Sequence, residues 1–563
     1  MKKNIWKIVT LLLCCAMLVG VVACGSSDNN SNSNSNSGGA TNTSSGDTGS
    51  GSAANTGSGG SNTGSGSNTG GGSNAGGSST PKRDTLNVAY AQDGGTLDPL
   101  YNVGWDILTG IRLLYDPLWE QLQDLSYRYI LAEPEVIDDL TLRAHIYPDA
   151  YFQSGNKVTA EDVLFTLDKA NNRVGVSAFF STMDMEKTRV IDELTIEMVF
   201  TESTVDRKGG FASFFIFDRL TYNGDTISAV PVGSGPYKLV DYVVGSHLKM
   251  EVNQDYWKGG QENYIPKINF LRLAEEAQRV NALLTGDVDV ADVPYQDIDF
   301  VQNDLDNMEV YFFRGDRTCN LHMNPTTTRN CFSELGTDAR RAIALAIDRD
   351  AIVRVAYSGY ASKSRMPLSA GTPDAYPELF DMGIYGEDYN PTLAKQLAES
   401  SGLVNYKPLL INNGGSVQVV VTEIIQLNLK AIGVEIEVQT LDQGSWLTVA
   451  FDESQWDMAV DFTFGGTVAA GYRTWSRMMG GYNTSPWPGS ERFMEIIEGP
   501  PPITTISDYN ILNAYYMELT QIHTASIPWF VLCDVLFPYA HDVDLKGFEP
   551  IRGGSFVYTD CYW

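Results

Sequence analysis

The second half of the chain alternates between two hydrophobic patterns. Apolar residues recur at helical spacing in 338–359 and 417–432, and short apolar runs stand between and after them at 408–412, 434–440 and 458–464. Strands that alternate with helices predict a parallel sheet covered by helices on both faces. Ligands of such sheets bind beyond the carboxyl ends of the strands. The segment after 458–464 is therefore expected to line a ligand site.

The first half mixes strands with isolated helices. A strand is predicted at 85–91, a helix at 106–114, and a hairpin in 188–200 that turns on Asp192 and Glu193. Thr159 and Asp162 have the spacing of a capping box, which predicts a helix beginning near residue 160. Segment 266–293 reads as a strand, a helix ending at Gly286 and a short apolar return.

The N-terminus predicts export. Lys2, Lys3 and Lys7 precede an apolar run from Ile8 to Val22, as in a secretory signal. Residues 21–24, VVAC, resemble a lipobox, so residues 1–23 are expected to be a lipoprotein signal peptide and Cys24 to carry the lipid. The alternative is a transmembrane anchor, for which the apolar run is short compared with the ~20 residues that a bilayer needs.

Residues 24–83 contain almost only Gly, Ser, Asn and Thr, which predicts a flexible tether. A flexible segment of ~55 residues reaches about 40 Å. The rest of the 563 residues holds nearly all of the apolar content, and that length predicts two or three lobes. The formal net charge of −30 argues against nucleic acid and anionic membrane surfaces as partners, although solubility explains the charge equally well.

No catalytic motif is present in the sequence. The five histidines are scattered, and GxSxG, P-loop and dinucleotide fingerprints are absent. GSGPYKL at 233–239 superficially resembles a phosphate loop, but it lacks the lysine and hydroxyl pair, so a Gly-Pro turn entering a strand is the better interpretation. We expect no enzyme activity, no cofactor and no metal. Cys319–Cys331 and Cys533–Cys561 are candidate disulfides by proximity in sequence alone.

Five segments together resemble the family 5 extracellular solute-binding proteins of ABC transporters, the dipeptide, oligopeptide and nickel-binding group. They are TLNVAYAQDGGTLDP (85–99), KVTAEDVLFTLDKA (157–170), GSGPYKLVDYVVGSHLKMEVNQDYWKG (233–259), DARRAIALAIDRDAIVRVAYSGYA (338–361) and SIPWFVLCDVLFPYAHDVDLKGF (526–548). The resemblance implies an α/β fold, a two-lobed type II periplasmic-binding-protein clamshell with an extra subdomain in the first lobe. Its implied limits are 84–125, 225–313 and 525–563 for lobe I, 126–224 for the inserted subdomain and 314–524 for lobe II.

The chain departs from the peptide binders at the expected ligand site. Those proteins place aspartates in the turn after the equivalent strand, and one of the carboxylates binds the peptide's ammonium. Here Gly466 and Ala469 take those positions. Asp461 is a candidate substitute, although a structural role on the other face of its strand is an equal alternative. The residues expected to contact the ligand are Tyr101, Asn102, Trp105, Asn324, Asp461, Thr463, Phe464, Gly465, Thr467, Tyr472 and Trp475.

The resemblance implies a monomeric lipoprotein, anchored outside the cytoplasm, that delivers a small solute to ABC permease subunits. An oligopeptide is the first choice of ligand. An oligosaccharide or another uncharged solute is the alternative, since the acidic anchor is missing and Tyr472, Trp475, Trp446 and Trp487 could stack on sugar rings. A solute sensor that signals to a membrane kinase is the alternative of another class.

Overall fold

The structure is a computed structural model. It describes residues 83–563 except for 101–104, 123–125, 172–182, 202–210, 212–213, 223–229, 231, 325–330, 370–371, 373–386, 451, 453, 465–490, 500–502, 504–505, 507 and 551–555. Residues 83–563 form one compact unit. None of the described helices is long and apolar enough to cross a membrane.

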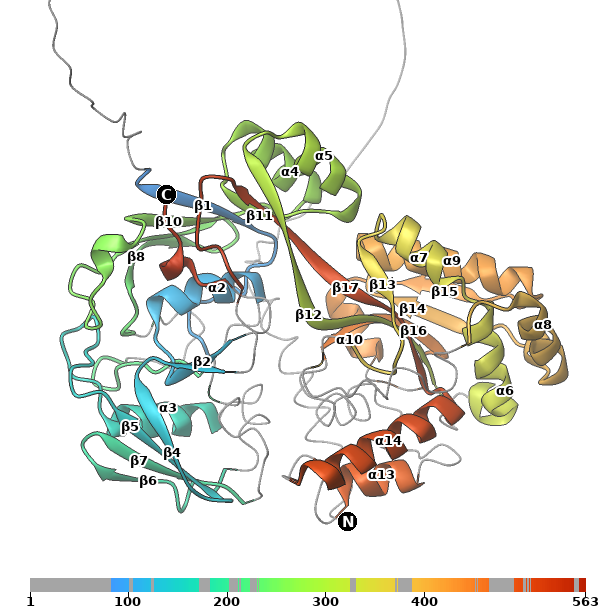
Figure 1. Ribbon diagram of the computed structural model, residues 1–563, viewed down its shortest axis with the longest axis horizontal. Helices are drawn as coiled ribbons and strands as arrows, with labels where there is room; N and C mark the ends of the chain where they lie inside the picture. The colour runs from blue at the N-terminus through green and yellow to red at the C-terminus, as the bar shows by residue number, and fades with distance from the viewer. Residues whose placement is uncertain are drawn as a thin grey trace, which may run out of the picture. The chain divides into compact units, whose positions relative to one another are not determined.

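An eleven-stranded sheet runs through this unit in the order β15-β14-β16-β12-β17-β11-β1-β10-β9-β8, and β13 pairs with β17 (Figure 1). The strands are β1 (Thr85–Tyr90), β8 (Tyr237–Val243), β9 (His247–Val252), β10 (Lys267–Arg272), β11 (Val290–Asp292), β12 (Met308–Met323), β13 (Ala361–Lys363), β14 (Leu409–Asn412), β15 (Glu437–Thr440), β16 (Met458–Phe464) and β17 (Trp529–Asp542).

The predicted strand and helix alternation after residue 335 is confirmed, but the sheet is mixed. β15, β14 and β16 are parallel to one another, whereas β16 is antiparallel to β12. The helices here are α6 (Cys331–Ala346), α7 (Arg349–Ala356), α8 (Pro391–Ser400), α9 (Ser416–Ala431), α10 (Gln443–Ala450), α13 (Glu491–Glu498) and α14 (Tyr509–Ser526). Asp348 caps α7 by accepting a hydrogen bond from the Ala351 amide over 3.0 Å.

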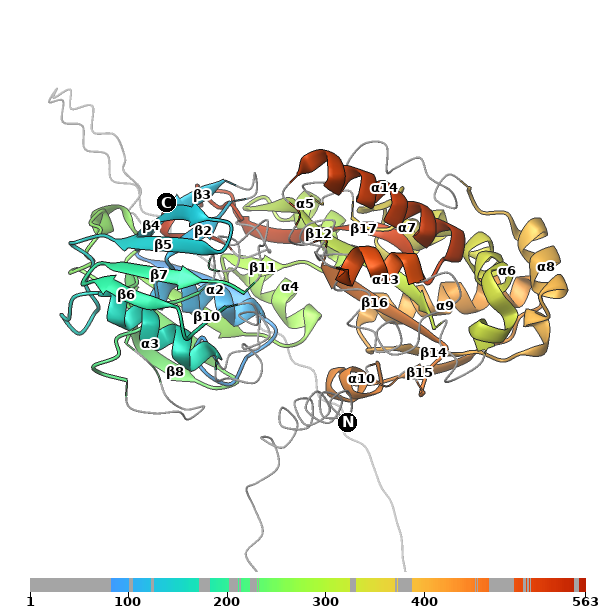
Figure 2. The ribbon, with the colours of Figure 1, turned by 90° about the horizontal axis from the view of Figure 1, so that it is seen from below.

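The N-terminal half contains two further sheets. One joins β2 (Trp119–Gln121) to β3 (Tyr127–Tyr129), and the other has the order β4-β5-β7-β6. Its strands are β4 (Ala132–Asp138), β5 (Thr141–Ile146), β6 (Arg189–Asp192) and β7 (Thr195–Val199), and α3 (Ala160–Asn171) contacts it through β6 and β7 (Figure 2). The capping box is confirmed, since Asp162 accepts from the Thr159 amide over 2.9 Å. The hairpin that turns after Asp192 is confirmed as well.

The Gly-Pro interpretation of 233–239 is confirmed by backbone packing. Gly235 donates to the Leu114 carbonyl over 3.1 Å, and a Cβ on Gly233 would lie 2.2 Å from that same oxygen. Only glycine fits so close to a neighbouring main chain. Leu114 ends α2 (Trp105–Leu114), and Tyr237 begins β8 two residues after Gly235. The glycines therefore pack a strand entry against a helix end.

Three hydrophobic cores support these elements. The largest gathers residues of β12, β14, β16 and β17 with helices α6 to α9, and the second gathers α2, α3, β1, β10 and the small sheets. The third lies where α4 (Glu276–Thr285) and α5 (Ile298–Asp304) pack beside β11 and β12. Strands β12 and β17 contribute to more than one core, so they connect the two halves of the unit.

Strands β12 and β17 pair along their length, from Met308 opposite Asp542 to His322 opposite Trp529. The pairing contains two register shifts, one of them between Cys319 and Asn320. Cys319 lies opposite Cys533, whereas all four described cysteines are thiols. The Cys319–Cys331 and Cys533–Cys561 disulfides considered from the sequence are therefore absent, because the sheet register gives Cys319 a neighbour distant in sequence.

Candidate functional site

Polar side chains gather on one face of β12, β16 and β17. Asn320 lies opposite Asp461, and Thr318 lies opposite both Thr463 and Asp534. Side chains alternate between the two faces of a strand, so 318 and 320 share a face with 461 and 463. Thr318, Asn320, Asp461 and Asp534 are all buried. We call these four residues the acidic cluster.

Hydrogen bonds hold the centre of the acidic cluster. The Thr318 hydroxyl donates to the Asn320 side-chain oxygen over 3.1 Å, and the Asn320 amide donates back to the Thr318 carbonyl over 3.3 Å. Asp461 and Asp534 belong to the strands on either side of β12. The cluster therefore places two buried carboxyl groups on one face of the sheet.

The cluster lies close to the end of β16. Asp461 is followed by Thr463 and Phe464, whose strand positions are described but whose side chains are not. The expected ligand residues that come next lie outside the described residues, as do the two positions that lack the aspartates; they are Gly465, Thr467, Tyr472 and Trp475, with Gly466 and Ala469. Their contact with a ligand stays a prediction.

The structure separates Asn324 from this strand end. Asn324 follows β12, where its side-chain amide donates to the Trp456 carbonyl over 2.9 Å and its backbone amide to the Asp457 carbonyl over 2.8 Å. Met458 begins β16 opposite Met323, whereas Phe464 lies opposite Arg317. At about 3.3 Å per residue, roughly 20 Å of strand lies between the two positions. Asn324 joins the start of β16 to β12, and a contact with ligand stays a prediction.

The expected contribution from the first half lies before and within α2. Tyr101 and Asn102 are outside the described residues, and Trp105 begins α2 with its side chain undescribed. Of the tryptophans weighed as stacking platforms, Trp446 is buried in the largest core, which is a structural role, and Trp487 is outside the described residues.

Sequence reasoning found Asp461 but missed Thr318, Asn320 and Asp534. The signal for two of them was the alternation in 318–324, where Thr318, Asn320, His322 and Asn324 stand at every second position of an otherwise apolar strand. Nothing in the sequence pairs Asp534 with Asp461, since a β-sheet register decides that proximity.

His322 continues the row formed by Thr318 and Asn320, and its chemistry differs from theirs. Burial lowers the pKa of His322 to about 3, so its imidazole is neutral at pH 7. His523, which packs edge-on against Trp529 at 4.2 Å between ring centroids, also has its pKa lowered to about 3 by burial. Among the described side chains, no group of three or more His, Cys, Asp or Glu residues is arranged to hold a metal ion.

β14 lies between β16 and β15 and is parallel to both. The Asn412 amide donates to the Thr440 hydroxyl over 3.2 Å, which joins the ends of the two strands. The chain then enters α9, where the Ser416 hydroxyl donates to the Glu276 carboxylate of α4 over 2.8 Å. Elements 140 residues apart thus meet at this edge of the sheet.

The chain is similar in sequence to proteins of one known family. The model of the bacterial extracellular solute-binding proteins, family 5, matches residues 127–487. The glutathione-binding protein GsiB of Pectobacterium atrosepticum is 23% identical over 475 residues, which are 80% of this chain and 89% of GsiB. The Escherichia coli GsiB is 22% identical over 496 residues, 84% of this chain and 93% of GsiB.

Solved structures share the fold. A putative peptide-binding protein AppA from Clostridium difficile superposes with a TM-score of 0.73 at 19% identity, covering 85% of this chain and 99% of AppA. DppA from Helicobacter pylori in complex with the peptide STSA gives 0.71 at 19% identity, covering 85% and 98%. The expected two-lobed α/β fold of type II periplasmic binding proteins is thereby confirmed. The chain belongs to the bacterial extracellular solute-binding proteins of family 5.

Proposed function

We propose that this chain is the lipid-anchored binding protein of an ABC importer and that its ligand is an oligopeptide. Its family consists of extracellular solute-binding proteins, which act without catalysis and serve ABC importers. The observation that carries the choice of ligand is the acidic cluster, in which the buried Asp461 lies opposite Asn320 and the buried Asp534 lies opposite Thr318. A carboxylate suits the α-ammonium of a peptide better than an uncharged sugar, because a carboxylate forms charge-assisted hydrogen bonds with an ammonium group.

The relatives support a peptide ligand. GsiB is a glutathione-binding protein, and DppA was solved with a tetrapeptide. In this chain Asp461, the middle residue of β16, would replace the aspartates missing at Gly466 and Ala469, which follow the same strand. Lobe I would consist of 84–125, 225–313 and 525–563 with the insert 126–224, and lobe II of 314–524. The separate hydrophobic cores support this division except at 527–535, whose buried residues belong to the core of lobe II.

Thermal unfolding tests the proposal. The purified chain is melted with a peptide library and with an oligosaccharide library. A ligand at 100 times its Kd adds about 2.7 kcal/mol of stability, which a melting curve resolves. We expect peptides to raise Tm, and the same peptides with an acetylated amino terminus to lose most of the effect. A glycan that raises Tm when no peptide does would refute the peptide assignment.

A substitution locates the ammonium site. Asp461→Asn should weaken binding of the identified peptide ~10- to 100-fold, because hydrogen bonds to a charged group contribute about 1.5–3 kcal/mol. Asp255→Asn is the matched control, since the Asp255 side chain is 88% exposed and pairs only with Lys238 in the described surface. Equal affinities of the two variants would show that Asp461 does not bind the ligand.

A further inference from the structure

Two thiols face each other inside the β12–β17 pairing. Cys319 and Cys533 are direct partners in the antiparallel register, and both are fully buried. Directly opposed residues of antiparallel strands have Cα atoms about 4.5–5.5 Å apart. A disulfide needs a Cα separation of about 4.4–6.8 Å. The backbone therefore already has the spacing that a disulfide requires.

Buried side chains surround the two sulfurs. The Cys533 thiol lies within hydrogen-bonding reach of the Cys319 thiol, and the Tyr357 hydroxyl lies beside both. That hydroxyl is buried and has no partner of standard geometry in the described part of the chain. The Tyr295 ring packs edge-on against Tyr357 at 4.9 Å between centroids. The two sulfurs thus have each other as neighbours in a dry environment.

The other two described cysteines are placed differently. The Cys561 thiol donates to the backbone carbonyls of Gly547 and Val557, at 3.6 and 3.7 Å, in the second core. Cys331 begins α6, outside the sheet that holds Cys319 and Cys533. The sheet register thus selects one pair among the four.

We propose that Cys319 and Cys533 are a disulfide-forming pair that covalently joins β12 to β17 once the chain has been exported. The family is extracellular, and extracellular compartments are oxidising. The loop that the bond would close, residues 320–532, contains nearly all of the proposed lobe II. Disulfides that close long loops restrict the unfolded chain most.

The chemistry needs a disulfide oxidant, such as oxidised glutathione or the active-site disulfide of a thiol oxidase. One cysteine thiolate attacks a sulfur of the oxidant, which forms a mixed disulfide and releases one thiol. The second thiolate then attacks the protein sulfur, which forms the Cys319–Cys533 bond and releases the second thiol. The oxidant gains two electrons and the two protons that the cysteines lose. Burial raises the pKa of the Cys533 thiol, so oxidation is expected before β12 and β17 close during folding.

The bond would also fix the backbone beneath the acidic cluster. Cys319 stands between Thr318 and Asn320, and Asp534 follows Cys533. Cross-linking these positions would hold the three polar side chains on their strands in one register. This consequence rests on the proposed function, whereas the covalent pair itself does not.

Disulfide mapping tests the pair on the unaltered full chain. The chain is refolded from denaturant in a mixture of reduced and oxidised glutathione, then denatured, alkylated and digested for mass spectrometry without reduction. We expect one cross-linked species that joins the peptides of Cys319 and Cys533, with Cys331 and Cys561 alkylated. Alkylation of both Cys319 and Cys533, or any other pairing of Cys319, would overturn the inference.

Redox dependence gives a second readout. The urea midpoint of the chain refolded with glutathione should fall when a reductant is added, and Cys533→Ser should remove that dependence. The matched control Cys331→Ser should keep it, and a midpoint unaffected by reductant in the unaltered chain would contradict a structural disulfide. Peptide affinity is measured in both redox states. A mapped disulfide in a chain that binds no peptide would refute the proposed ligand and leave the pair intact.

Discussion

The Trp257 indole nitrogen donates a hydrogen bond to the Asp116 carboxylate over 3.0 Å, and the Tyr256 hydroxyl donates to the other oxygen over 3.2 Å. Both donors precede the exposed Lys258, and Asp116 follows α2 by two residues. The carboxyl group is buried, and burial raises the pKa of Asp116 to about 7 even though both donors lower it. This contact ties 256–257 to the segment that leaves α2.

The raised pKa of Asp116 predicts a pH dependence of stability. In the unfolded chain this carboxyl group titrates near 3.8, so the folded state binds more protons between pH 4 and 7. The contribution of Asp116 is therefore present in full below about pH 4 and is lost as pH rises towards 7, at up to about 1.4 kcal/mol per pH unit. Urea unfolding at several pH values gives the free energy of unfolding as a function of pH. Between pH 4 and 7 this free energy should fall less steeply for Asp116→Asn than for the unaltered chain. An unchanged slope, or the same change in Asp255→Asn, would contradict this assignment.

The buried histidines predict the opposite dependence. The pKa values of His322 and His523 are lowered from 6.5 to about 3, so the unfolded chain binds more protons between those limits. Their contribution is complete above about pH 6.5 and is lost as pH falls towards 3. Between pH 3 and 6.5 the free energy of unfolding rises with pH, and His322→Gln should make this rise less steep. The expected decrease corresponds to one fewer proton taken up on unfolding. His145→Gln, which replaces a half-exposed histidine paired with Glu135, is the comparison variant for a histidine outside the core.

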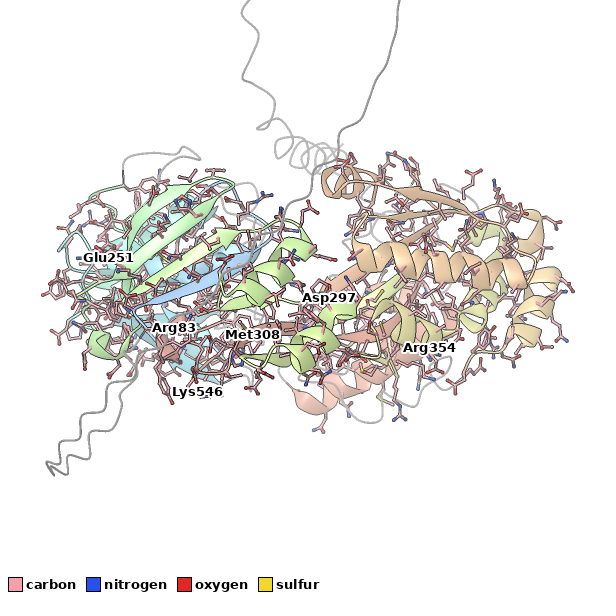
Figure 3. The ribbon with its side chains drawn as sticks, turned by 90° about the horizontal axis from the view of Figure 1, so that it is seen from above. Arg83, Glu251, Asp297, Met308, Arg354 and Lys546 are labelled. Carbon is pink, nitrogen blue, oxygen red and sulfur yellow. The ribbon has the colours of Figure 1, made fainter. Side chains whose placement is uncertain are left out.

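The contact between Ser416 and Glu276 predicts a modest effect on ligand affinity. Glu276 accepts from the Ser416 hydroxyl at the start of α9, whose N-cap residue, Gly415, offers no side chain. A carboxylate at a helix N-terminus is favourable, so this contact should stabilise the arrangement in which α4 meets α9. Figure 3 marks Asp297, whose pKa is raised by burial and by the same Glu276 carboxylate.

Glu276→Gln should weaken ligand binding about two- to fivefold, because an exposed charged contact contributes less than ~1 kcal/mol. Titration calorimetry with the peptide identified by thermal shift measures it. Glu275→Gln is the control, since Glu275 is exposed and makes no side-chain capping bond to α4. If both variants bind as the unaltered chain does, the contact has no role in closing the two lobes.

The contacts of Arg83 predict that its substitution destabilises the folded unit. Its guanidinium pairs with Asp289 and, over 2.6 Å, with Asp542, and it lies 3.9 Å from the Trp563 ring centroid. Figure 3 marks Arg83 and Met308, whose strand partner is Asp542. Arg83→Ala would leave the buried Asp289 without this cation and should cost about 1–3 kcal/mol in urea unfolding. Lys267→Ala, which removes the exposed pair with Asp84, should cost less than ~1 kcal/mol.

Lipidation of Cys24 would anchor the protein to the membrane. If Cys24 carries the lipid, Cys24→Ala should move the protein from the membrane fraction into an unanchored or unprocessed form, and metabolic labelling with a fatty acid should mark only the unaltered chain. Ser26→Ala is the control, since it keeps the cysteine. Membrane retention of an unlabelled Cys24→Ala protein would favour the transmembrane alternative.

Local signals predicted most elements because their causes are local. The Thr159–Asp162 contact acts within three residues, and so the helix start could be predicted from the sequence. The order of the strands in the eleven-stranded sheet could not be predicted from the sequence. Strand β12 pairs with both β16 and β17 through contacts between residues more than a hundred positions apart. A parallel sheet was expected from the alternation, and the antiparallel β12 makes it mixed.

The sequence by itself determined the family, most of the element types in the second half and the likeness to a two-lobed binding protein, since these follow from short-range periodicity and ordered motifs. Only the tertiary structure decided which polar residues share a face. Asp461 gained Asn320 as its cross-strand partner, Thr318 gained Asp534, and Cys319 gained Cys533 in place of Cys331. Strand register has a period of two and is set by long-range pairing, so a one-residue slip would have placed each of these side chains on the opposite face.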